Sequence, residues 1–346
     1  MPTLTIRRSL LSRFVALAAL CCAAGSAMAQ QSPTKLRLTL DWRFEGQLSM
    51  FMLAKTKGYY EKEGLDVSID AGAGSGSAIN RVVGGSHDLA TADLSALIEF
   101  VGNNPGPARL QGVYLLYNRS PLIIQALKKS GIAKPQDLAG KKIAAPVFDS
   151  VRKSFPIYAR AIGIDPKSVT FLNVDPALRE TLVVRGDADA TTGFELNRLT
   201  LIARGAKEDE IVTFGYADAG LKLYGNAILA STKLITENPQ ALRAFLRATN
   251  RALVDAIANP EESIRANKTF DSLIDEKTEL EKLRITLRSI DTEFAKADGL
   301  GAVNDGDLAR QIDDVAAAFD LKSKPSAEAI FNSSFLPARA ERNPRK

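Results

Sequence analysis

Aromatic rings and carboxylates stand together after several predicted strands of this sequence. Trp42 and Phe44 precede Glu45 after one strand, and Phe148 precedes Asp149 after another. An aromatic face can stack on a flat ring, which contributes roughly 0.5–1.5 kcal/mol per pair beyond area burial. A desolvated carboxylate needs a partner that is rich in hydrogen-bond donors. These residue types predict a site for a small planar molecule that is uncharged or cationic and carries N–H groups, such as an aminopyrimidine.

The candidate ligand-binding residues share one position, at or just after the carboxyl ends of predicted strands. They are Trp42, Phe44, Glu45, Gln47, Ser75, Ser77, Asp93, Ser95, Phe148, Asp149, Ser150, Phe194, Glu195, Asn197 and Tyr216. In open α/β sheets, small ligands bind at this end of the strands. Two alternatives stay open. Some of the rings could only fill a core between lobes, and a sulfonate or nitrate would fit if Arg43 or Arg152 turned inward to offset the acids.

Catalytic and metal-binding patterns are weak in this sequence. His87 is the only histidine, so a Ser-His-Asp triad would have to use it, and it stands in a Gly-Gly-Ser-His-Asp turn. A zinc site would need cysteines or a second histidine. Asp271 and Asp275 lie in a charge-rich helical region, where a solvated face explains them. We therefore predict a binding protein, not an enzyme, with no catalytic residue, metal or cofactor.

The stretch 36–66 positions the first candidates. Residues 36–40, LRLTL, alternate apolar and polar side chains with the period of two that is typical of a half-buried strand. Apolar residues return at helical spacing over 47–59, and a second strand is predicted over 65–69. This order of strand, loop, helix and strand indicates an α/β unit.

A Gly-rich loop over 71–77 follows the second strand. We expect Ser77 to cap a helix that begins at Ala78, and we expect the loop to offer backbone N–H groups to a ligand oxygen. The motif fits neither the dinucleotide fingerprint nor a P-loop, and a plain flexible connection explains it equally well. Asp93 and Ser95 follow the next strand, where an ordinary helix N-cap is the alternative to ligand binding.

The rest of the chain continues in the same pattern. Further strands are predicted over 89–92, 110–117, 122–127, 142–145, 169–173, 188–191, 211–216 and 224–230. Amphipathic helices are predicted over 241–257, 260–269, 278–290 and 305–319, and the last has the spacing of a helix laid on a sheet. The segments 82–92 and 183–192 repeat one motif, a helix end, a Gly turn and a short strand.

Two hinged α/β lobes with a cleft between them account for this repetition. We predict one lobe over 30–118 and 222–346, with the C-terminal helices, and the other over 119–221. The chain would cross between them near 117–120 and near 220–225. Closure of such lobes around a solute uses a few hinge residues.

The first 29 residues have the three parts of a secretory signal. Arg7, Arg8 and Arg13 precede an apolar run over 14–24, and Ala-Met-Ala ends at Ala29, where cleavage is expected. Arg7 and Arg8 leave a twin-arginine export route as the alternative. Both cysteines lie in this segment, so the mature protein would have no disulfide and would depend on its core. The mature charge falls from +5 to +2, which argues against a general nucleic-acid surface.

The chain resembles the periplasmic solute-binding proteins of ABC importers in the group that takes nitrate, sulfonates, taurine and the pyrimidine precursor of thiamine, the THI5-like or NMT1-like family. The resemblance lies in LTLDW, in the run Gly58-Tyr59-Tyr60 with Glu63-Gly64-Leu65-Asp66-Val67, and in Val83-Gly84-Gly85-Ser86-His87-Asp88. It implies the two-lobed periplasmic binding protein fold (type II), a periplasmic location, a small-molecule solute, and an ABC permease and ATPase as partners. We expect a monomer.

Two departures from this family bear on the ligand. Relatives that carry the pyrimidine precursor typically have an aromatic-Pro-Asn type of sequence after the Asp-Trp pair, whereas this chain has residues 43–47, RFEGQ. The eukaryotic relatives that act as enzymes depend on a cysteine-rich motif and a histidine, which the mature chain does not match. The enzyme role therefore does not carry over from the resemblance. A binding protein for a small anion is the first alternative, and a secreted THI5-like enzyme ranks below it.

Overall fold

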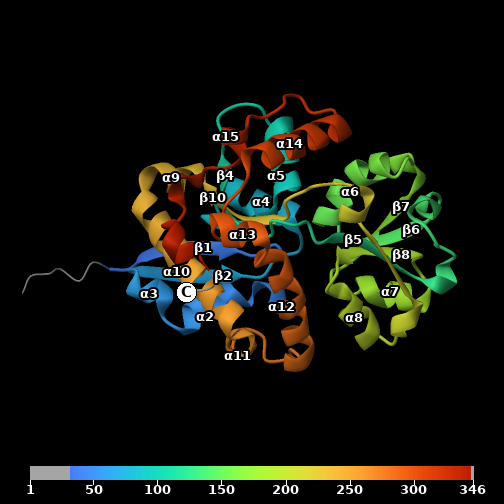
Figure 1. Cartoon of the computed structure of the whole chain (residues 1–346), viewed down its shortest axis with the longest axis horizontal. Coiled ribbons are helices and arrows are strands. Elements are labelled where there is room, and N and C mark those ends of the chain that lie inside the picture. The colour runs from blue at the N-terminus through green and yellow to red at the C-terminus, as the bar shows by residue number, and fades with distance from the viewer. Residues whose placement is uncertain (1–31, 344–346) are drawn as a thin grey trace, which may run out of the picture. The chain divides into compact units, whose positions relative to one another are not determined.

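Two five-stranded sheets of mixed direction form the framework of the protein (Figure 1). The computed structural model describes residues 32–343, so the predicted signal peptide and its cleavage site after Ala29 lie outside the described residues. From Thr34 onward the chain forms one unit, to which both sheets belong. Among the described residues, no helix has the length and apolar character needed to span a bilayer.

The first sheet has the strand order β2-β1-β3-β10-β4. Its strands are β1 (Thr34–Thr39), β2 (Leu65–Asp70), β3 (Leu89–Asp93), β4 (Leu110–Leu115) and β10 (Asn226–Ser231). Strand β1 is parallel to β2 and β3, whereas β10 is antiparallel to β3 and β4. The carboxyl ends of β1, β2 and β3 therefore meet at one edge, together with the amino end of β10.

The second sheet repeats this plan with the order β7-β6-β8-β5-β9. Its strands are β5 (Leu122–Leu127), β6 (Lys142–Ala145), β7 (Thr170–Asn173), β8 (Ala190–Phe194) and β9 (Ile211–Gly215). Strand β6 is parallel to β7 and β8, and β5 is antiparallel to β8 and β9. The repeated sequence motif ends in β3 in one sheet and in β8 in the other, which hold equivalent places in the two strand orders.

Helices cover both sheets. In chain order they are α2 (Ser49–Thr56), α3 (Tyr59–Lys62), α4 (Ser75–Val83), α5 (Leu94–Asn103), α6 (Ser150–Ala161), α7 (Arg179–Arg185), α8 (Asn197–Ala203), α9 (Thr232–Glu237), α10 (Pro239–Ala258), α11 (Pro260–Lys268), α12 (Glu276–Ile290), α13 (Glu293–Asp298), α14 (Asp305–Phe319) and α15 (Ala327–Ile330). Short 3-10 turns lie at Gly46–Leu48, Lys128–Ser130, Pro135–Leu138, Pro166–Ser168, Glu208–Glu210, Ala217–Ala219, Ser333–Phe335 and Arg339–Arg342.

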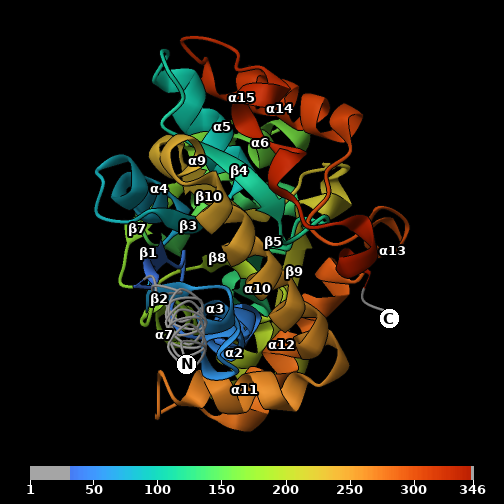
Figure 2. The same ribbon diagram turned by 90° about the vertical axis from the view of Figure 1, so that its left-hand side faces the viewer.

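The C-terminal helices divide between two faces of the first sheet. Helices α10 and α11 pack against α2, whereas α14 and α15 pack against α5, and Figure 2 shows the two groups on opposite sides of this sheet. Helix α14 also packs against α6, and Arg160 of α6 donates a hydrogen bond to the Ala317 carbonyl at 2.8 Å. We predicted that α14 lies on a sheet, but its main neighbours are helices, so this prediction is wrong. The amphipathic spacing indicates that one face of the helix is buried and does not identify the element that covers it.

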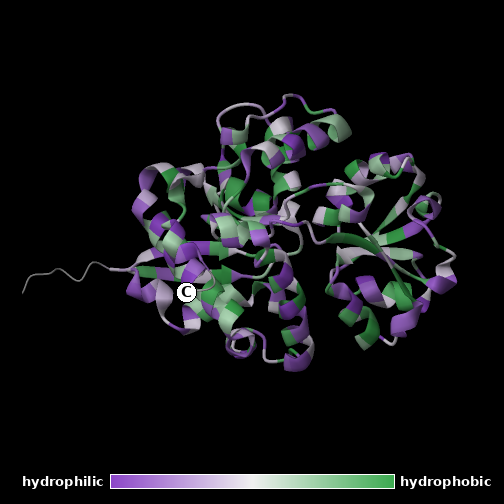
Figure 3. Ribbon diagram, viewed as in Figure 1, coloured by the Kyte–Doolittle hydropathy of each residue, from purple (hydrophilic) through white to green (hydrophobic). Residues whose placement is uncertain are grey.

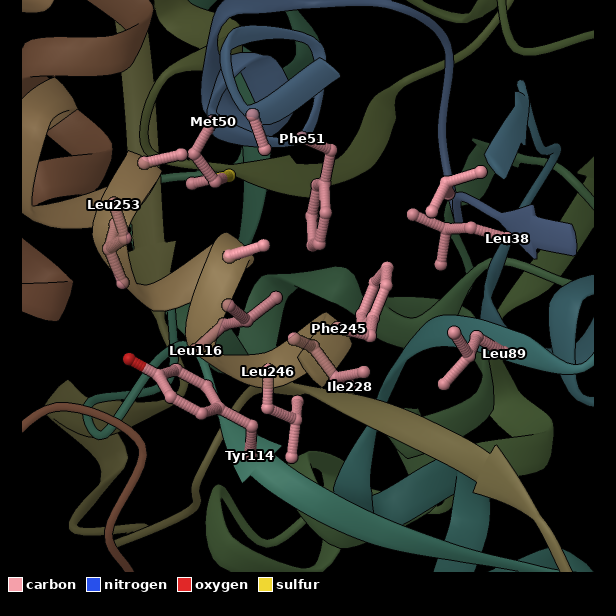
Figure 4. Close-up of a cluster of buried hydrophobic side chains, with 14 of the residues drawn as sticks. Leu38, Met50, Phe51, Leu89, Tyr114, Leu116, Ile228, Phe245, Leu246 and Leu253 are labelled. Atoms are coloured by element: carbon pink, nitrogen blue, oxygen red, sulfur yellow. The ribbon is translucent and has the colours of Figure 1, made fainter. Parts of the chain in front are cut away.

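The largest core lies between the first sheet and the helices α2 and α10. Figure 4 shows Leu38, Phe51 and Phe245 pointing toward one another there, and Tyr60 stacks on Phe245 with ring centroids 5.2 Å apart. In Figure 3 the strands of both sheets are largely hydrophobic, as expected where helices cover a sheet on both faces. This burial holds the strand ends, and the loops that follow them, in fixed positions.

The chain passes between the two sheets twice, through residues 116–121 after β4 and through residues 216–225 after β9. These segments lie where the sequence places its two crossings. We keep lobe 1 as 30–118 with 222–346 and lobe 2 as 119–221 as our proposal for the domain boundaries, with the two segments as the hinge.

The start of α4 differs from the expectation. The helix begins at Ser75 with Gly74 as its N-cap residue, so Ser77 lies inside the first turn and does not cap. Gly74 has a φ of +123°, a conformation that other residues rarely adopt. The helix begins directly after this glycine, two residues before the expected cap Ser77. The hydroxyl of Ser75 instead accepts a hydrogen bond from the Asp93 N–H at 3.0 Å.

Candidate ligand-binding cleft

A cavity of about 420 Å³, its open mouth included, lies between the two lobes. Lobe 1 contributes Asp41, Trp42, Gln47, Leu48, Gly74, Ser75, Tyr117 and Asn226 to its wall. Lobe 2 contributes Asp149, Ser150, Arg179, Gly193, Phe194 and Asn197. The wall combines three aromatic rings with a few polar groups, as small-molecule sites do.

Seven of the fifteen candidate residues line this cavity. They are Trp42, Gln47, Ser75, Asp149, Ser150, Phe194 and Asn197. Their contact with a ligand remains a prediction. They come from loops after parallel strands of both sheets, so the strand-end rule located the region. Phe194 crosses the lobe boundary, since its ring meets Tyr117 edge-to-face with centroids 6.1 Å apart.

Asp41 lies on the lobe 1 wall and was not among the predicted site residues. One of its carboxylate oxygens accepts from the Thr91 hydroxyl at 2.5 Å, and the other accepts from Asn226 Nδ2 at 2.6 Å. Burial raises the pKa of the Asp41 carboxyl, and these two hydrogen bonds offset only part of the rise. Asp41 could have been found from the sequence, because it stands between the first strand and Trp42.

Arg179 of lobe 2 also lines the cavity, and we did not predict this cation from the sequence. Its side chain is 2% exposed, and it contacts Glu180 at 2.7 Å and Asp149 at 3.3 Å. Its guanidinium lies over the Trp42 ring, 4.9 Å from the centroid. Burial opposes the charge, but Glu180 and Asp149 outweigh burial and raise the pKa of Arg179. Neither Arg43 nor Arg152, the two arginines considered beforehand, lines the cavity.

Asp149 both caps a helix and forms part of the cavity wall. Its carboxylate accepts from the Arg152 N–H at 2.9 Å at the start of α6, and Ser150 follows it at the wall. Burial raises the pKa of the Asp149 carboxyl, and Arg179 partly offsets this rise. Asn197 similarly fixes the end of β8, because its side-chain oxygen accepts from the Phe194 N–H at 2.7 Å.

Phe44 and Glu45 are not part of the cavity wall. Glu45 is buried against Lys282 of α12, with 3.0 Å between Oε2 and Nζ, and it also pairs with Arg43. Burial alone would raise its pKa, but Lys282 and Arg43 lower the pKa of Glu45 to about 2. Phe44 packs on Phe270 with ring centroids 5.6 Å apart. These residues anchor the loop after β1 to the C-terminal helices, a long-range pairing that the local sequence does not indicate.

Ser77, Asp93 and Ser95 also lie outside the wall. Asp93 is the N-cap of α5, since its Oδ1 accepts from the N–H groups of Ser95 and Ala96 at 2.9 and 3.3 Å. The hydroxyl of Ser95 accepts from Gln311 Nε2 at 2.9 Å. The N-cap alternative therefore describes Asp93, which stands behind Ser75 and supports the wall.

Phe148, Glu195 and Tyr216 point elsewhere. Phe148 is 40% exposed and lines a separate outer groove, and the Glu195 side chain is exposed. Tyr216 is fully buried inside lobe 2, where it stacks on Tyr158 at 4.2 Å and donates its hydroxyl to the Val151 carbonyl at 2.9 Å. A buried tyrosine needs a partner for its hydroxyl, and the helix α6 backbone supplies one, so this ring fills the core.

The Gly-rich loop of lobe 1 contacts the backbone of lobe 2 beside the cavity. The Gly76 N–H donates to the Phe148 carbonyl of lobe 2 at 3.2 Å, so this N–H does not face the cavity as expected. A Cβ added at Gly74 would lie 2.3 Å from the same carbonyl oxygen. Glycine is required here because the two backbones approach so closely.

Replacing Gly74 with alanine is expected to weaken ligand binding about tenfold, or about 1.4 kcal/mol. The methyl group would hold the lobes apart at the Phe148 carbonyl. Binding measured by calorimetry checks this result. Gly85→Ala is the matched control, because Gly85 also has a positive φ, +76°, but has nothing within 4 Å of its Cβ position. Equal losses of affinity in both variants would show that backbone strain, and not lobe contact, is responsible.

The fold and the cavity together define the class of protein. Two α/β lobes joined by two crossings, with a cavity between them, form the two-lobed periplasmic binding protein fold. The alkanesulfonate-binding protein SsuA from Xanthomonas axonopodis pv. citri, bound to MOPS, has this fold with a TM-score of 0.68 at 18% identity, over 87% of this chain and 99% of that chain. A protein of Bordetella bronchiseptica RB50 gives a TM-score of 0.72 at 19% identity, over 88% and 96%.

The chain belongs to the family described as NMT1/THI5 like, whose sequence model matches residues 46–263, more than half of its length. It is similar to the riboflavin-binding protein RibY of Chloroflexus aurantiacus, 26% identical over 91% of this chain and 90% of that protein. It is also similar to a formylaminopyrimidine-binding protein of Halalkalibacterium halodurans, 26% identical over 70% and 72%. A 4-amino-5-hydroxymethyl-2-methylpyrimidine phosphate synthase of Schizosaccharomyces pombe is 22% identical over 68% and 69%.

Proposed function

We propose that this protein is the solute-binding component of an ABC importer, which captures a small planar heterocycle bearing N–H groups and delivers it to a membrane permease and its ATPase. The observation that carries the proposal is the wall of the cavity. Trp42 and Phe194 supply aromatic faces from opposite lobes, and Asp41 adds a buried carboxyl group to the wall. Each carboxyl oxygen of Asp41 accepts one hydrogen bond from the protein and has room to accept a second from a ligand N–H.

The proposal places the protein in the periplasm as a monomer. Its support is the signal-like sequence of residues 1–29 and the similarity of its fold to binding proteins such as the periplasmic aliphatic sulphonate binding protein SsuA from Escherichia coli. Relatives named for riboflavin and for formylaminopyrimidine support a nitrogen heterocycle as the solute.

A small anion, such as an alkanesulfonate, taurine or nitrate, is the second candidate, and Arg179 is the observation that favours it. A buried guanidinium at a cavity is a common anion partner. Here, however, Glu180 and Asp149 already hold this charge, and Asp41 adds another acid to the opposite wall. An anion would therefore enter a site with more carboxyl groups than cations, which is why we place it second.

Turnover is the third possibility, because relatives include 4-amino-5-hydroxymethyl-2-methylpyrimidine phosphate synthases. The only histidine of the sequence, His87, contacts Asp70 and Ser86 at 2.9 Å and does not line the cavity. Among residues 32–343, no group of three or more His, Cys, Asp or Glu residues could hold a metal ion. His87 therefore brings no catalytic group to the cavity wall, and for this reason we place turnover third.

A thermal-shift screen tests the proposed function. The mature protein is mixed with riboflavin, 4-amino-5-hydroxymethyl-2-methylpyrimidine, taurine, nitrate and an alkanesulfonate, since a ligand of the native state raises the melting temperature by mass action. Stabilisation by a heterocycle that is recovered unchanged is the expected result. Stabilisation by the anions alone would favour the second candidate, and a new product in the mixture would favour an enzyme.

Replacing Trp42 with alanine is expected to weaken binding of the stabilising heterocycle at least about tenfold, near 1.4 kcal/mol. The change removes an aromatic face and the surface on which Arg179 lies. Calorimetric titration measures the affinity, and Phe44→Leu, which changes a ring outside the cavity wall, serves as control. An affinity of Trp42→Ala within about threefold of the wild type would contradict the proposed position of the ligand.

A further inference from the structure

Three buried polar atoms without a hydrogen-bond partner belong to residues that line the cavity. They are the side-chain oxygens of Gln47 and Asn226 and the hydroxyl of Tyr117, on residues that are 4%, 1% and 1% exposed. Most buried polar atoms in folded proteins have a partner, so unpaired ones require an explanation. Their position on one cavity wall points to groups supplied by a ligand.

The orientation of both amides is determined by neighbouring carboxylates. Asn226 Nδ2 donates to Asp41 at 2.6 Å, and Gln47 Nε2 faces Glu45 Oε2 at 3.5 Å. Each amide directs its nitrogen to a carboxyl oxygen, so its own oxygen points away from the acid. The lobe 1 wall therefore presents acceptors, namely two amide oxygens beside the Asp41 carboxylate.

The lobe 2 wall presents donors. Arg179 directs Nε and Nη2 to Glu180 Oε1 and Nη1 to Asp149 Oδ2. These bonds use three of the five N–H groups of a guanidinium, and two remain. Because the guanidinium is buried and lines the cavity, a ligand acceptor is the natural partner for them.

We infer that the ligand is a lactam-type heterocycle, in which a ring N–H faces the acceptors of lobe 1 and a ring carbonyl faces Arg179 of lobe 2. This inference rests on the proposed function and narrows its ligand class. An aminopyrimidine without a carbonyl group offers donors to lobe 1 but leaves the guanidinium only ring nitrogens to meet. A sulfonate would place oxygens against the amide oxygens and Asp41, where acceptors would face acceptors.

Three probes of related shape test the inference. Lumiflavin carries a ring N–H between two carbonyl groups, 3-methyllumiflavin replaces that hydrogen by a methyl group, and 4-amino-5-hydroxymethyl-2-methylpyrimidine has amino donors and no carbonyl. The dissociation constants of all three are measured on the mature wild-type protein by calorimetry. We expect lumiflavin to bind at least about tenfold more tightly than either of the others.

The outcomes separate this inference from the proposed function. Binding of the aminopyrimidine as tightly as lumiflavin, or a loss on methylation of less than about threefold, overturns the inference and leaves the proposed function intact. Binding of none of the three overturns the proposed function itself.

The variant Arg179→Lys gives a second measurement, because it keeps a cation beside Asp149 and Glu180 but loses the planar fork. We expect it to reduce the preference for lumiflavin over the aminopyrimidine at least about fivefold. An unchanged preference would overturn the assignment of Arg179. The ratio of two ligands on one variant is insensitive to a partial loss of folded protein, and if the variant does not fold, the wild-type comparison still decides.

Discussion

Replacing Lys282 with methionine is expected to lower the free energy of unfolding by about 3–5 kcal/mol. The ammonium of Lys282 lies 3.0 Å from Glu45 Oε2 and 2.7 Å from Glu279 Oε1, and all three side chains are buried. Glu279 also accepts the Gly46 N–H at 2.6 Å. Removing the cation leaves two carboxylates in a site without solvent, and this is more costly than the loss of a surface ion pair.

Chemical denaturation at pH 7 measures this effect. The matched control is Lys268→Met, which breaks an ion pair with Glu276 whose two side chains are 46% and 45% exposed. Exposed pairs contribute roughly 0–1 kcal/mol, so the control should change little. A second variant, Lys282→Met with Glu45→Gln, should recover part of the loss, because it removes one unpaired acid. Similar small losses for Lys282→Met and Lys268→Met would contradict our assignment of a buried network.

The pH dependence of stability is expected to show the burial of Asp93. Burial raises the pKa of this carboxyl to about 7, and the N–H groups of Ser95 and Ala96 offset only part of that rise. In the unfolded chain, an aspartate titrates near pH 3.9. Between these values the folded state binds more protons than the unfolded state, so stability falls as pH rises. The wild type should lose about 3–4 kcal/mol between pH 4 and pH 7 from this group.

Denaturation curves at several pH values test this slope in Asp93→Asn. Asparagine retains an oxygen for the N-cap and does not ionise, so the variant should gain stability at pH 7–8 and lose much of the slope. Burial also raises the pKa values of Asp41 and Asp149, so a smaller slope of the same sign should remain.

The control for this test is Asp275→Asn. Asp275 is also an N-cap aspartate, accepting the Thr278 N–H at 2.8 Å, but it is exposed, and hydrogen bonds from the Thr278 side chain and N–H lower its pKa. The change should therefore leave the fall in stability between pH 4 and pH 7 in place. A wild-type slope that persists unchanged in Asp93→Asn would show that this carboxyl titrates normally.

The sequence predicted the cavity wall best where candidate residues directly follow a segment with a clear strand pattern. The side-chain pattern predicted β1 and β2 as strands, and the residues after these two strands include Trp42 and Ser75 of the cavity wall. The same rule placed Asp149 and Phe194 in lobe 2. The rule failed for Tyr216, because the Tyr216 hydroxyl donates to the Val151 carbonyl of helix α6 and the ring lies in the core of lobe 2.

Two groups at the cavity gave no local signal. Asn226 begins β10, and only the antiparallel pairing of that strand with β3 brings its amino end to the edge where parallel strands end. Arg179 begins the short helix α7, and its partners Asp149 and Trp42 are 30 and 137 residues away along the chain. Their roles follow from contacts between distant segments.

By itself, then, the sequence determined the α/β class, the repetition of one strand plan and the edge at which a ligand site would form. These features arise from the period of side chains along the backbone and from turn residues, which act over a few positions. Tertiary structure alone decided which acids face the cavity, because pairing depends on packing between distant segments. Lys282 removes Glu45 from the site, while Arg179 enters it, and the charge that a ligand meets is set by these two long-range contacts.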